Sequence, residues 1–475
     1  MWKLATVTCM LVVSMLCGVQ LEAQKVGLQN SRCEVGLRYQ ISYQPNWGDS
    51  HAVVVEVIPG SPADLAGLRP WDIIRTLNGR STEEMTEEEI NSALLDPAAG
   101  TIEMVVANFG YPNRKVSLRK KCIPSAALSE DDLAKAFAQY SVEDVSSRRF
   151  NMPFRYQSPA KVDFLKYRTF SISMKGALMD PVERELKQVM EQKGLRYQQK
   201  GGDLTLVVSH SLERNPEYRE GTATGKEKDF HNYRVNSRSG EIQDYPFLSL
   251  NAPHFFGAFR LRMAVDIYDS ATQGKVWSVV AEERLDEGFS TANYATAFMP
   301  LMMANFPFMN YILNPTYLLH KNSHRSIGIY QDSRDLQLVL WVDKDSPADR
   351  AGIRPGDRLV TINGLPLDSS VAKMTEAYHR FLKKSWTYRD EDTIFPSVDG
   401  FQQNMYWKVD KYLQVAETMQ DPRLFGAFSY LFSHRTYVNS PIIKQIVVER
   451  ERKNGQRDAL LVAPDMVRKD YVTFF

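Results

Sequence analysis

The sequence lacks the short motifs that mark common hydrolases and nucleotide-binding enzymes. Its 475 residues contain no His-Glu-x-x-His pair, no Gly-x-Ser-x-Gly turn, no Asp-Thr-Gly, no phosphate-binding loop and no dinucleotide-binding glycine pattern. The eight histidines show no paired metal-ligand spacing. These absences favour a protein that binds over one that catalyses, and we expect no catalytic residue, no metal and no cofactor.

An excess of charge of one sign is also absent. Lys and Arg number 58 against 57 Asp and Glu, so the net charge is +1. A chain so balanced carries no electrostatic footprint for nucleic acid or anionic lipid. Hydrophobic residues at 43% and aromatic residues at 11% indicate a folded protein. The length allows about three domains of ordinary size.

Cysteine is scarce, with four in the chain. Residues 1–23 combine a short basic head, an apolar stretch and a cleavage site that ends in a small residue, which predicts a secretory signal peptide removed before Gln24. Cys9 and Cys17 lie within this segment. The apolar stretch is too short and wrongly flanked for a spanning helix. Lipid attachment at Cys17 is not expected, because the preceding Leu16 is too large for a lipidation site.

One stretch occurs twice. Residues 61–79 and 346–364 are identical at twelve of nineteen positions. In each copy a Ser-Pro pair predicts the start of a short helix and a glycine its end. An Asp then leads into a strand that closes with Asn-Gly, a tight-turn dipeptide. Trp71 stands where the second copy has Gly356, so we expect an altered turn in the first copy.

A hydrophobic-Gly-hydrophobic triplet precedes each copy, at residues 35–37 and 327–329. Triplet, β-rich run and repeated stretch together resemble the PDZ domain, particularly its bacterial HtrA-like form. The resemblance implies that the triplet begins a carboxylate-binding loop and that a ligand adds as a strand to the edges at Arg38–Tyr43 and Tyr330–Asp332. The implied peptide-binding residues are Val35, Gly36, Leu37, Arg38, Tyr39, Ile90, Asn91, Leu94, Ile327, Gly328, Ile329 and Tyr330.

The first copy offers the better groove. Thr86 and Glu89 predict a capping box at the start of its groove helix. Ile90 and Leu94 are then expected either to floor the ligand pocket or to belong to the core beneath it, and Asn91 is expected to face the ligand. A bulky residue at Gly36 is expected to abolish binding and leave the fold intact.

The two remaining cysteines bracket the first PDZ-like unit. In a PDZ-like fold the two ends of the domain lie side by side, which implies that Cys33 and Cys122 form a disulfide in an exported chain. Two free thiols remain the alternative.

The central region combines helix and strand patterns. A helix is predicted over residues 181–194 with Leu186, Val189 and Met190 buried, followed by a strand at 203–210 and a hairpin at 259–277. This region resembles a bacterial envelope domain of unknown function, common in lipoproteins of Gram-negative species. That resemblance implies an α+β fold and no established chemistry, and it rests on Asp163, Phe164, Tyr167, Thr169, Phe170, Asp269, Gly274, Lys275 and Trp277.

Three further segments carry expectations. The polar stretch 213–245 is expected to be a long surface loop. Residues 298–319 are Met- and aromatic-rich, but their prolines and asparagines favour a buried connection between the central domain and the second unit over a membrane span. Residues 384–440 interrupt the second unit and are predicted to be helical, with an apolar face that could cover the second groove or contact the central domain.

The predicted fold class is α+β: two PDZ-like, partly open β-barrels with short helices flank a central α+β domain. The predicted function is that of an exported, non-enzymatic adaptor or scaffold, which binds a C-terminal or extended peptide segment in the periplasm or envelope of a Gram-negative bacterium. The alternative is an envelope peptidase with an active site in the central domain. The predicted boundaries are signal peptide 1–23, first PDZ-like domain 30–124, helical linker 125–158, central domain 159–315 and second PDZ-like domain 316–467 with its insertion at 384–440.

Overall fold

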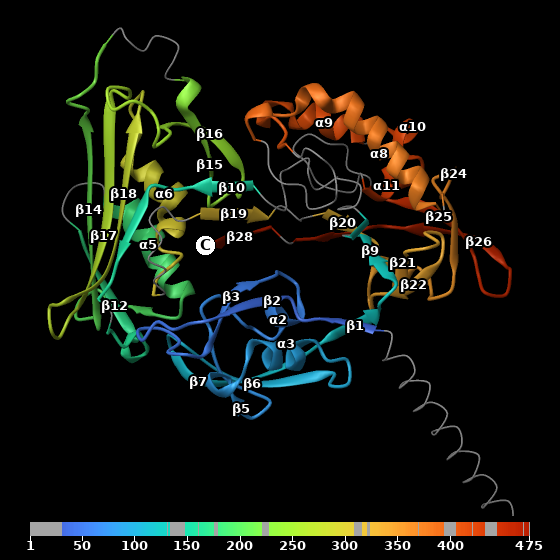
Figure 1. Cartoon of the computed structure of the whole chain (residues 1–475), viewed down its shortest axis with the longest axis horizontal. Helices are drawn as coiled ribbons and strands as arrows, with labels where there is room; N and C mark the ends of the chain where they lie inside the picture. The colour runs from blue at the N-terminus through green and yellow to red at the C-terminus, as the bar shows by residue number, and fades with distance from the viewer. Residues whose placement is uncertain are drawn as a thin grey trace, which may run out of the picture.

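The computed structural model places three folded bodies around a small central sheet (Figure 1). In that view the first PDZ-like unit lies below, the central domain at the left and the second unit at the right. The structure describes residues 31–130, 132–133, 148–159, 161–174, 179–220, 228–307, 316–320, 324–368, 370–393, 405–419, 421–432, 444–468 and 470–474. The predicted signal peptide lies outside these residues. Within them, every helix is too short or too polar to cross a lipid bilayer.

The first unit is a six-stranded antiparallel sheet in the order β2-β3-β4-β6-β7, with β5 on β4. Its buried residues alternate along β6 and β7, as expected for strands with one face in a core. Strands β1 and β8 pair with Cys33 opposite Cys122, and the two cysteines are disulfide-bonded, as predicted. The elements are β1 Ser31–Glu34, β2 Leu37–Ile41, β3 Ala52–Val57, α2 Pro62–Leu65, β4 Ile73–Leu77, β5 Arg80–Ser81, η1 Thr82–Glu84, α3 Glu87–Leu95, β6 Thr101–Asn108, β7 Tyr111–Arg119 and β8 Lys121–Pro124.

The repeated stretch folds as its sequence predicts. Ser61 caps α2 by accepting a hydrogen bond from an amide three residues on, and Ser346 caps α7 (Pro347–Arg350) in the same way. The glycine after each helix has a positive φ, and both Asn-Gly pairs have positive φ at both residues, which gives tight turns.

The expectation of an altered turn at Trp71 is wrong. Trp71 has φ +73°, close to the +93° of Gly356, and each residue donates its amide to a strand carbonyl at 2.7 Å. A left-handed conformation costs a non-glycine residue about 1–2 kcal/mol. The turn is therefore retained, and contacts of the indole elsewhere must offset its strain.

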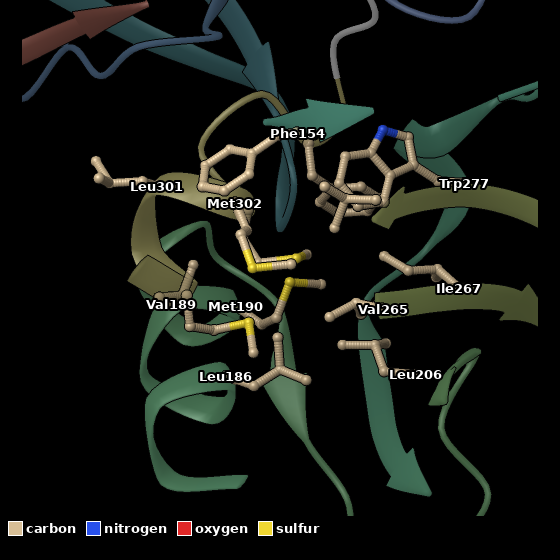
Figure 2. Packing of buried hydrophobic residues seen from close by; sticks show 14 of the residues in the cluster. Phe154, Leu186, Val189, Met190, Leu206, Val265, Ile267, Trp277, Leu301 and Met302 are labelled. Carbon is tan, nitrogen blue, oxygen red and sulfur yellow. The ribbon is translucent and has the colours of Figure 1, made fainter. Parts of the chain in front are cut away.

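The central domain is an eight-stranded sheet with two helices on one face. Leu186, Val189 and Met190 of α5 are buried, as predicted, in one cluster with Val265 and Trp277 of neighbouring strands. In Figure 2 Leu186 and Met190 lie between the helix and the sheet, and Val189 lies on the side of Leu301. The elements are β11 Phe154–Gln157, η3 Phe164–Lys166, β12 Thr169–Met174, α5 Met179–Gln192, β13 Arg196–Tyr197, β14 Leu204–Arg214, η4 Lys228–Phe230, β15 His231–Val235, β16 Ile242–Leu248, β17 Phe259–Asp269, β18 Lys275–Leu285 and α6 Thr291–Met302.

Two residues of the central sequence pattern, Tyr167 and Asp269, meet at one place. The Asp269 carboxylate accepts hydrogen bonds from Lys166 Nζ and Tyr167 Oη, each at 2.9 Å, and from two amides of its own turn. The hydrogen bond from Lys166 is the main cause that lowers the pKa of Asp269. The pattern thus marks the junction between the opening turn and the late hairpin.

The prediction of one long surface loop at 213–245 is wrong in part. Strands β14 and β16 extend into this stretch and β15 lies within it. Strand β15 pairs with β16, which joins the main sheet through Phe247. Residues 221–227 lie outside the described part. Half-exposed polar strands do not show the alternation on which a sequence-based assignment depends.

The first unit and the central domain share one hydrophobic core. Phe109 stacks on Phe306 with ring centroids 5.4 Å apart, and Trp71 Nε1 donates to the carbonyl of Ala304 at 2.8 Å. The connection after α6 is buried, as expected, but its described residues pack against the first unit and not the second. Residues 308–315 lie outside the described part.

The second unit repeats the plan of the first and adds a helical insertion. Part of the insertion packs with α8 in a cluster that contains Phe381, Trp407 and Val415, while Phe428 and Leu431 enter the core of the unit. The elements are β20 His324–Ser326, β21 Ile329–Asp332, β22 Val339–Val342, α7, β23 Arg358–Ile362, β24 Leu365–Pro366, α8 Val371–Ser385, η5 Trp386–Tyr388, η6 Glu391–Thr393, η7 Val409–Lys411, α9 Tyr412–Met419, α10 Pro422–Phe425, α11 Phe428–Phe432, β25 Ile446–Glu451, β26 Arg457–Val462 and β27 Asp465–Val467.

The linker 125–158 is mostly strand where it is described, so the expectation of a helical linker fails there. Helical residues begin at Glu130, after the predicted Ser129–Asp132 cap, but residues 134–147 lie outside the described part. Strand β9 (Ala127–Ser129) joins the second unit. Strand β10 (Arg148–Asn151) pairs with β19 (Thr316–His320), which pairs with β28 (Tyr471–Phe474). This three-stranded sheet runs between the bodies in Figure 1.

Candidate functional site

The loop of the first unit is fixed through its carbonyls. The carbonyl of Val35 accepts from Ala63 N at 2.9 Å, and that of Gly36 accepts from Ile58 N at 2.8 Å and from Ser61 Oγ at 3.2 Å. Within the described residues, the amides of Val35 and Gly36 donate no hydrogen bond. Two successive amides held in this way form a concavity suited to an anion.

An open strand edge lies beside this loop. Of the described strands, only β3 pairs with β2, so the other edge of β2 can accept an added strand. Helix α3 begins with the predicted capping box of Thr86 and Glu89. Ile90 and Leu94 are buried in the core below, at 0% and 3% exposure.

Tyr39 spans the space between the strand and the helix. Its hydroxyl donates toward the Glu87 carbonyl at 3.1 Å and Asn91 Oδ1 at 3.0 Å. Burial raises the pKa of Tyr39 to about 12, so the hydroxyl stays a donor at neutral pH. Asn91, expected to face a ligand directly, is therefore engaged by Tyr39. A strand that enters this groove must displace or pack against the phenol.

Gly36 is required by the fold itself, contrary to expectation. A Cβ at Gly36, which has φ +70°, would lie 2.1 Å from Cβ of Ser61, the cap of α2. Gly328 stands in the same relation to Ser346, at 2.4 Å. The glycine lets the loop approach the helix cap, so a bulky residue there would disrupt the unit as well as any binding.

The loop of the second unit is engaged by a carboxylate of the same chain. Glu130 accepts from the amides of Ile327 at 3.0 Å and Gly328 at 3.4 Å, and from the hydroxyl of Ser326. Glu130 is 8% exposed, and its burial raises the pKa of its carboxyl, while the hydrogen bonds from Ser326 and the loop amides act in the opposite direction.

The edge of the second unit is also occupied. Strand β9 lies antiparallel to β21, with Ser129 opposite Tyr330 and Ala127 opposite Asp332. The amide of Ser333 continues the ladder by donating to the carbonyl of Ala126 at 3.0 Å. The two grooves thus differ in state: the first has an open edge and unbonded loop amides, and the second has neither.

The structure brings each predicted set of residues together. Val35 and Gly36 form the first loop, Leu37, Arg38 and Tyr39 begin β2, and Ile90, Asn91 and Leu94 lie on α3, which Tyr39 contacts through Asn91. Their role in binding stays a prediction. Ile327, Gly328, Ile329 and Tyr330 form the second loop and strand. Sequence reasoning missed Leu128, Glu130 and Leu133, for which the Ser129–Asp132 cap was the only local signal.

A separate cavity of about 430 Å³ lies where the first unit, the central domain and β28 meet. Its lining is mostly apolar, with Trp71, Phe109 and Phe474 among its residues. Lys193 Nζ at this cavity donates to the carbonyls of Ala304 at 3.0 Å and Phe306 at 2.8 Å. Among the described residues, no group of three His, Cys, Asp or Glu side chains is placed to hold a metal ion.

Two family models match the chain. The PDZ domain matches residues 53–108 and 338–384, and a domain of unknown function (DUF4136) matches residues 155–308 between them. The chain therefore carries two PDZ domains that flank a DUF4136 domain, as the sequence predicted.

Known proteins are similar to all or part of this chain. A PDZ domain protein from Parabacteroides distasonis is 29% identical, covers 94% of this chain and 99% of its own, and superposes with a TM-score of 0.77. A DUF4136 family protein from Bacteroides thetaiotaomicron is 14% identical over 34% of this chain and all of its own, with a TM-score of 0.19. Carboxyl-terminal-processing peptidase 2 of Arabidopsis thaliana is 24% identical over 157 residues, 33% of this chain. The chain spans 27% of the length of that curated relative.

Proposed function

We propose that this chain, in which two PDZ domains flank a DUF4136 domain, binds polypeptide segments in its first PDZ groove and serves as a non-enzymatic adaptor of the bacterial envelope. One observation carries the proposal. The amides of Val35 and Gly36 are unbonded within the described residues, whereas the equivalent amides of the second loop bind a carboxylate. The first loop can therefore bind a carboxylate, as the second loop already does.

The ligand adds as a strand to β2. Its backbone pairs with the open edge, and its terminal carboxylate accepts hydrogen bonds from Val35 and Gly36. Ile90 and Leu94 are buried in the core beneath, and we do not propose them as contacts of the ligand. The hydroxyl of Tyr39 leaves Glu87 and Asn91 as the strand enters, and its ring can pack on the ligand. Affinity comes mainly from the backbone pairing.

The envelope location rests on three supports: the signal-like N-terminus, the DUF4136 match and the bonded cysteine pair, which is typical of oxidising compartments. Mass analysis of the mature N-terminus tests it. Gln24 as the first residue supports an exported protein without an anchor, whereas a lipid-modified Cys17 would make it a membrane-anchored lipoprotein.

The groove is tested with a library of peptides that end in a free carboxylate, applied to the full chain with its disulfide intact. We expect binders at sub-millimolar concentration that slow amide exchange at residues 35–41. The same peptides with an amidated C-terminus should lose most of this protection, because they cannot place a carboxylate on the loop. If no peptide protects residues 35–41, the first groove is not a peptide site.

A pair of variants on α3 separates groove binding from other surfaces. Asn91→Trp places an indole beside Tyr39 and should abolish binding, whereas Ser92→Trp, at the neighbouring exposed position, should not. Both variants should unfold like the natural protein, because neither position is in the core. Equal loss in both variants would place the peptide elsewhere.

The peptidase match favours one second candidate, an enzyme that uses its PDZ domains to capture substrate. Incubation of the purified protein with unfolded polypeptides, with and without divalent metals, tests it. Cleavage activity that co-purifies with the protein would overturn the adaptor proposal. Substrates that stay intact would support the adaptor proposal.

A further inference from the structure

The second PDZ groove has a binding partner within the chain. We propose that residues 127–130, held in place by Asp132 and Leu133, are a displaceable ligand bound in cis, and that this groove takes an external peptide with a free C-terminal carboxylate only when the segment leaves. The proposal concerns the second groove alone and does not depend on binding at the first.

The direction of β9 matches that of a peptide ligand. A ligand strand lies antiparallel to the PDZ edge strand and ends at the carboxylate-binding loop. Strand β9 is antiparallel to β21, and its last residue, Ser129, pairs with Tyr330 next to that loop. Glu130 follows immediately. The chain thus approaches the loop from the side and in the direction that a peptide would.

The carboxylate of Glu130 takes the place of a terminal carboxylate. It accepts from two successive loop amides and from the Ser326 hydroxyl. Hydrogen bonds to an ionised acceptor are roughly twice as strong as neutral ones, and a buried carboxylate without donors is costly. The loop and Glu130 therefore satisfy each other, and an arriving carboxylate must compete for the same amides.

A turn in the main chain explains why a side-chain carboxylate, and not a terminal one, binds the loop amides. Ser129 and Asp132 cap each other, with Asp132 N donating to Ser129 Oγ at 2.9 Å and Ser129 N donating to Asp132 Oδ2 at 3.0 Å. The main chain therefore turns into a helix at the loop, where a peptide would end. Leu133, 2% exposed, then packs in the core of the second unit, and Leu128 packs against the same core.

The segment is tethered by contacts on both sides of β9. Lys121 forms an ion pair with Asp343 at 2.8 Å, and the Cys33–Cys122 disulfide lies just before β9. Arg32 pairs with Asp132 at 2.8 Å. A tethered ligand acts at a high effective concentration, so a free peptide of similar affinity is excluded until the tethered contacts are weakened.

The test uses a synthetic probe with the sequence of residues 125–130, Ser-Ala-Ala-Leu-Ser-Glu, acetylated and with a free C-terminus. Amide exchange at residues 327–332 is measured in the full chain, with residues 35–41 as a separate readout of the first groove. In the natural protein the 327–332 amides should be protected without the probe, and added probe should not change the exchange of residues 127–129.

Variants then open the groove. Glu130→Ala combined with Leu133→Ala should speed exchange at residues 327–332 by at least about ten-fold and raise probe affinity there by a similar factor. Glu130→Gln, which keeps the shape and loses the charge, should give a smaller change in the same direction. Glu84→Ala, at an exposed glutamate of the first unit, is the matched control. It should change neither the amide exchange at residues 327–332 nor the affinity for the probe.

Two results would overturn the proposal. In the first, the 327–332 amides of the natural protein exchange as fast as an unpaired edge. In the second, the opened variants bind the probe at this loop no better than the natural protein does, although they retain its circular dichroism spectrum. Either result is separable from failure of the first groove, because residues 35–41 are followed independently.

Discussion

The indole of Trp71 donates a hydrogen bond to the carbonyl of Ala304, 2.8 Å away, and so joins the first PDZ domain to the end of α6 in the central domain. Trp71 holds a left-handed backbone conformation, and its own carbonyl accepts from Trp47 Nε1 at 2.9 Å. The indole is 7% exposed and belongs to the core shared by both bodies. The strained backbone is thus offset by contacts between domains.

Trp71→Ala should destabilise the protein strongly. Loss of a buried tryptophan costs about 3–5 kcal/mol, and alanine keeps the left-handed strain. Denaturant unfolding of the full chain measures the change. Trp386→Ala, at a tryptophan that is 44% exposed, should stay within about 0.5 kcal/mol of the natural protein. An equal effect of both substitutions would contradict the role of Trp71 at the interface.

Loss of the disulfide should weaken the first unit. Cys33 and Cys122 are separated by 89 residues, and closure of such a loop stabilises by about 4–5 kcal/mol in the chain-entropy model, often less in practice. The paired substitution Cys33→Ser with Cys122→Ser should therefore lower the free energy of unfolding by about 2–5 kcal/mol. Alkylation of the unfolded, non-reduced protein should label neither cysteine. Full labelling of both would show free thiols.

Local chemistry made the PDZ units predictable from sequence. The Ser-Pro start of α2, its terminal glycine and the Asn-Gly turn each act within a few residues, so their spacing determines the structure. The same holds for the buried stripe of α5. The turn at Trp71 could not be predicted, because the left-handed backbone is stabilised by Ala304, more than 200 positions away.

For the same reason, the sequence did not predict that the second groove is occupied by a segment of the same chain. Glu130 and Gly328 are far apart in the chain, and nothing near Glu130 marks it as a carboxylate that enters a loop. The insertion at 384–440 was expected to be a possible cover for this groove. Its described residues instead pack with Phe381 of α8, around Val415, or enter the core of the unit through Phe428. The groove is occupied instead by β9, in a linker expected to be helical.

Lys193 should make stability depend on pH above neutrality. Burial lowers the pKa of Lys193 to about 7. An unfolded lysine has a pKa of about 10.4, so between these values the unfolded state binds more protons and stability rises with pH. The slope from this one group is at most about 1.4 kcal/mol per pH unit.

Unfolding of the natural protein is compared with that of Lys193→Met from pH 7 to pH 9. The substitution should remove the rise, because methionine has no proton to lose. Lys200→Met, at an exposed lysine, should leave the profile unchanged. Parallel profiles for the natural protein and Lys193→Met would mean that Lys193 stays protonated in the folded state.

Gly36 and Gly60 allow the packing role of the loop glycine to be separated from its backbone conformation. Both have a positive φ, +70° and +73°, so alanine at either position carries a similar left-handed strain of about 1–2 kcal/mol. A Cβ at Gly60 meets nothing within 4 Å, whereas one at Gly36 lies 2.1 Å from Cβ of Ser61. Gly36→Ala should therefore be clearly more destabilising than Gly60→Ala. Equal losses of stability in denaturant unfolding would mean that the loop can move away from Ser61, and Gly36 would then be free to serve the ligand, as its place in the sequence first indicated.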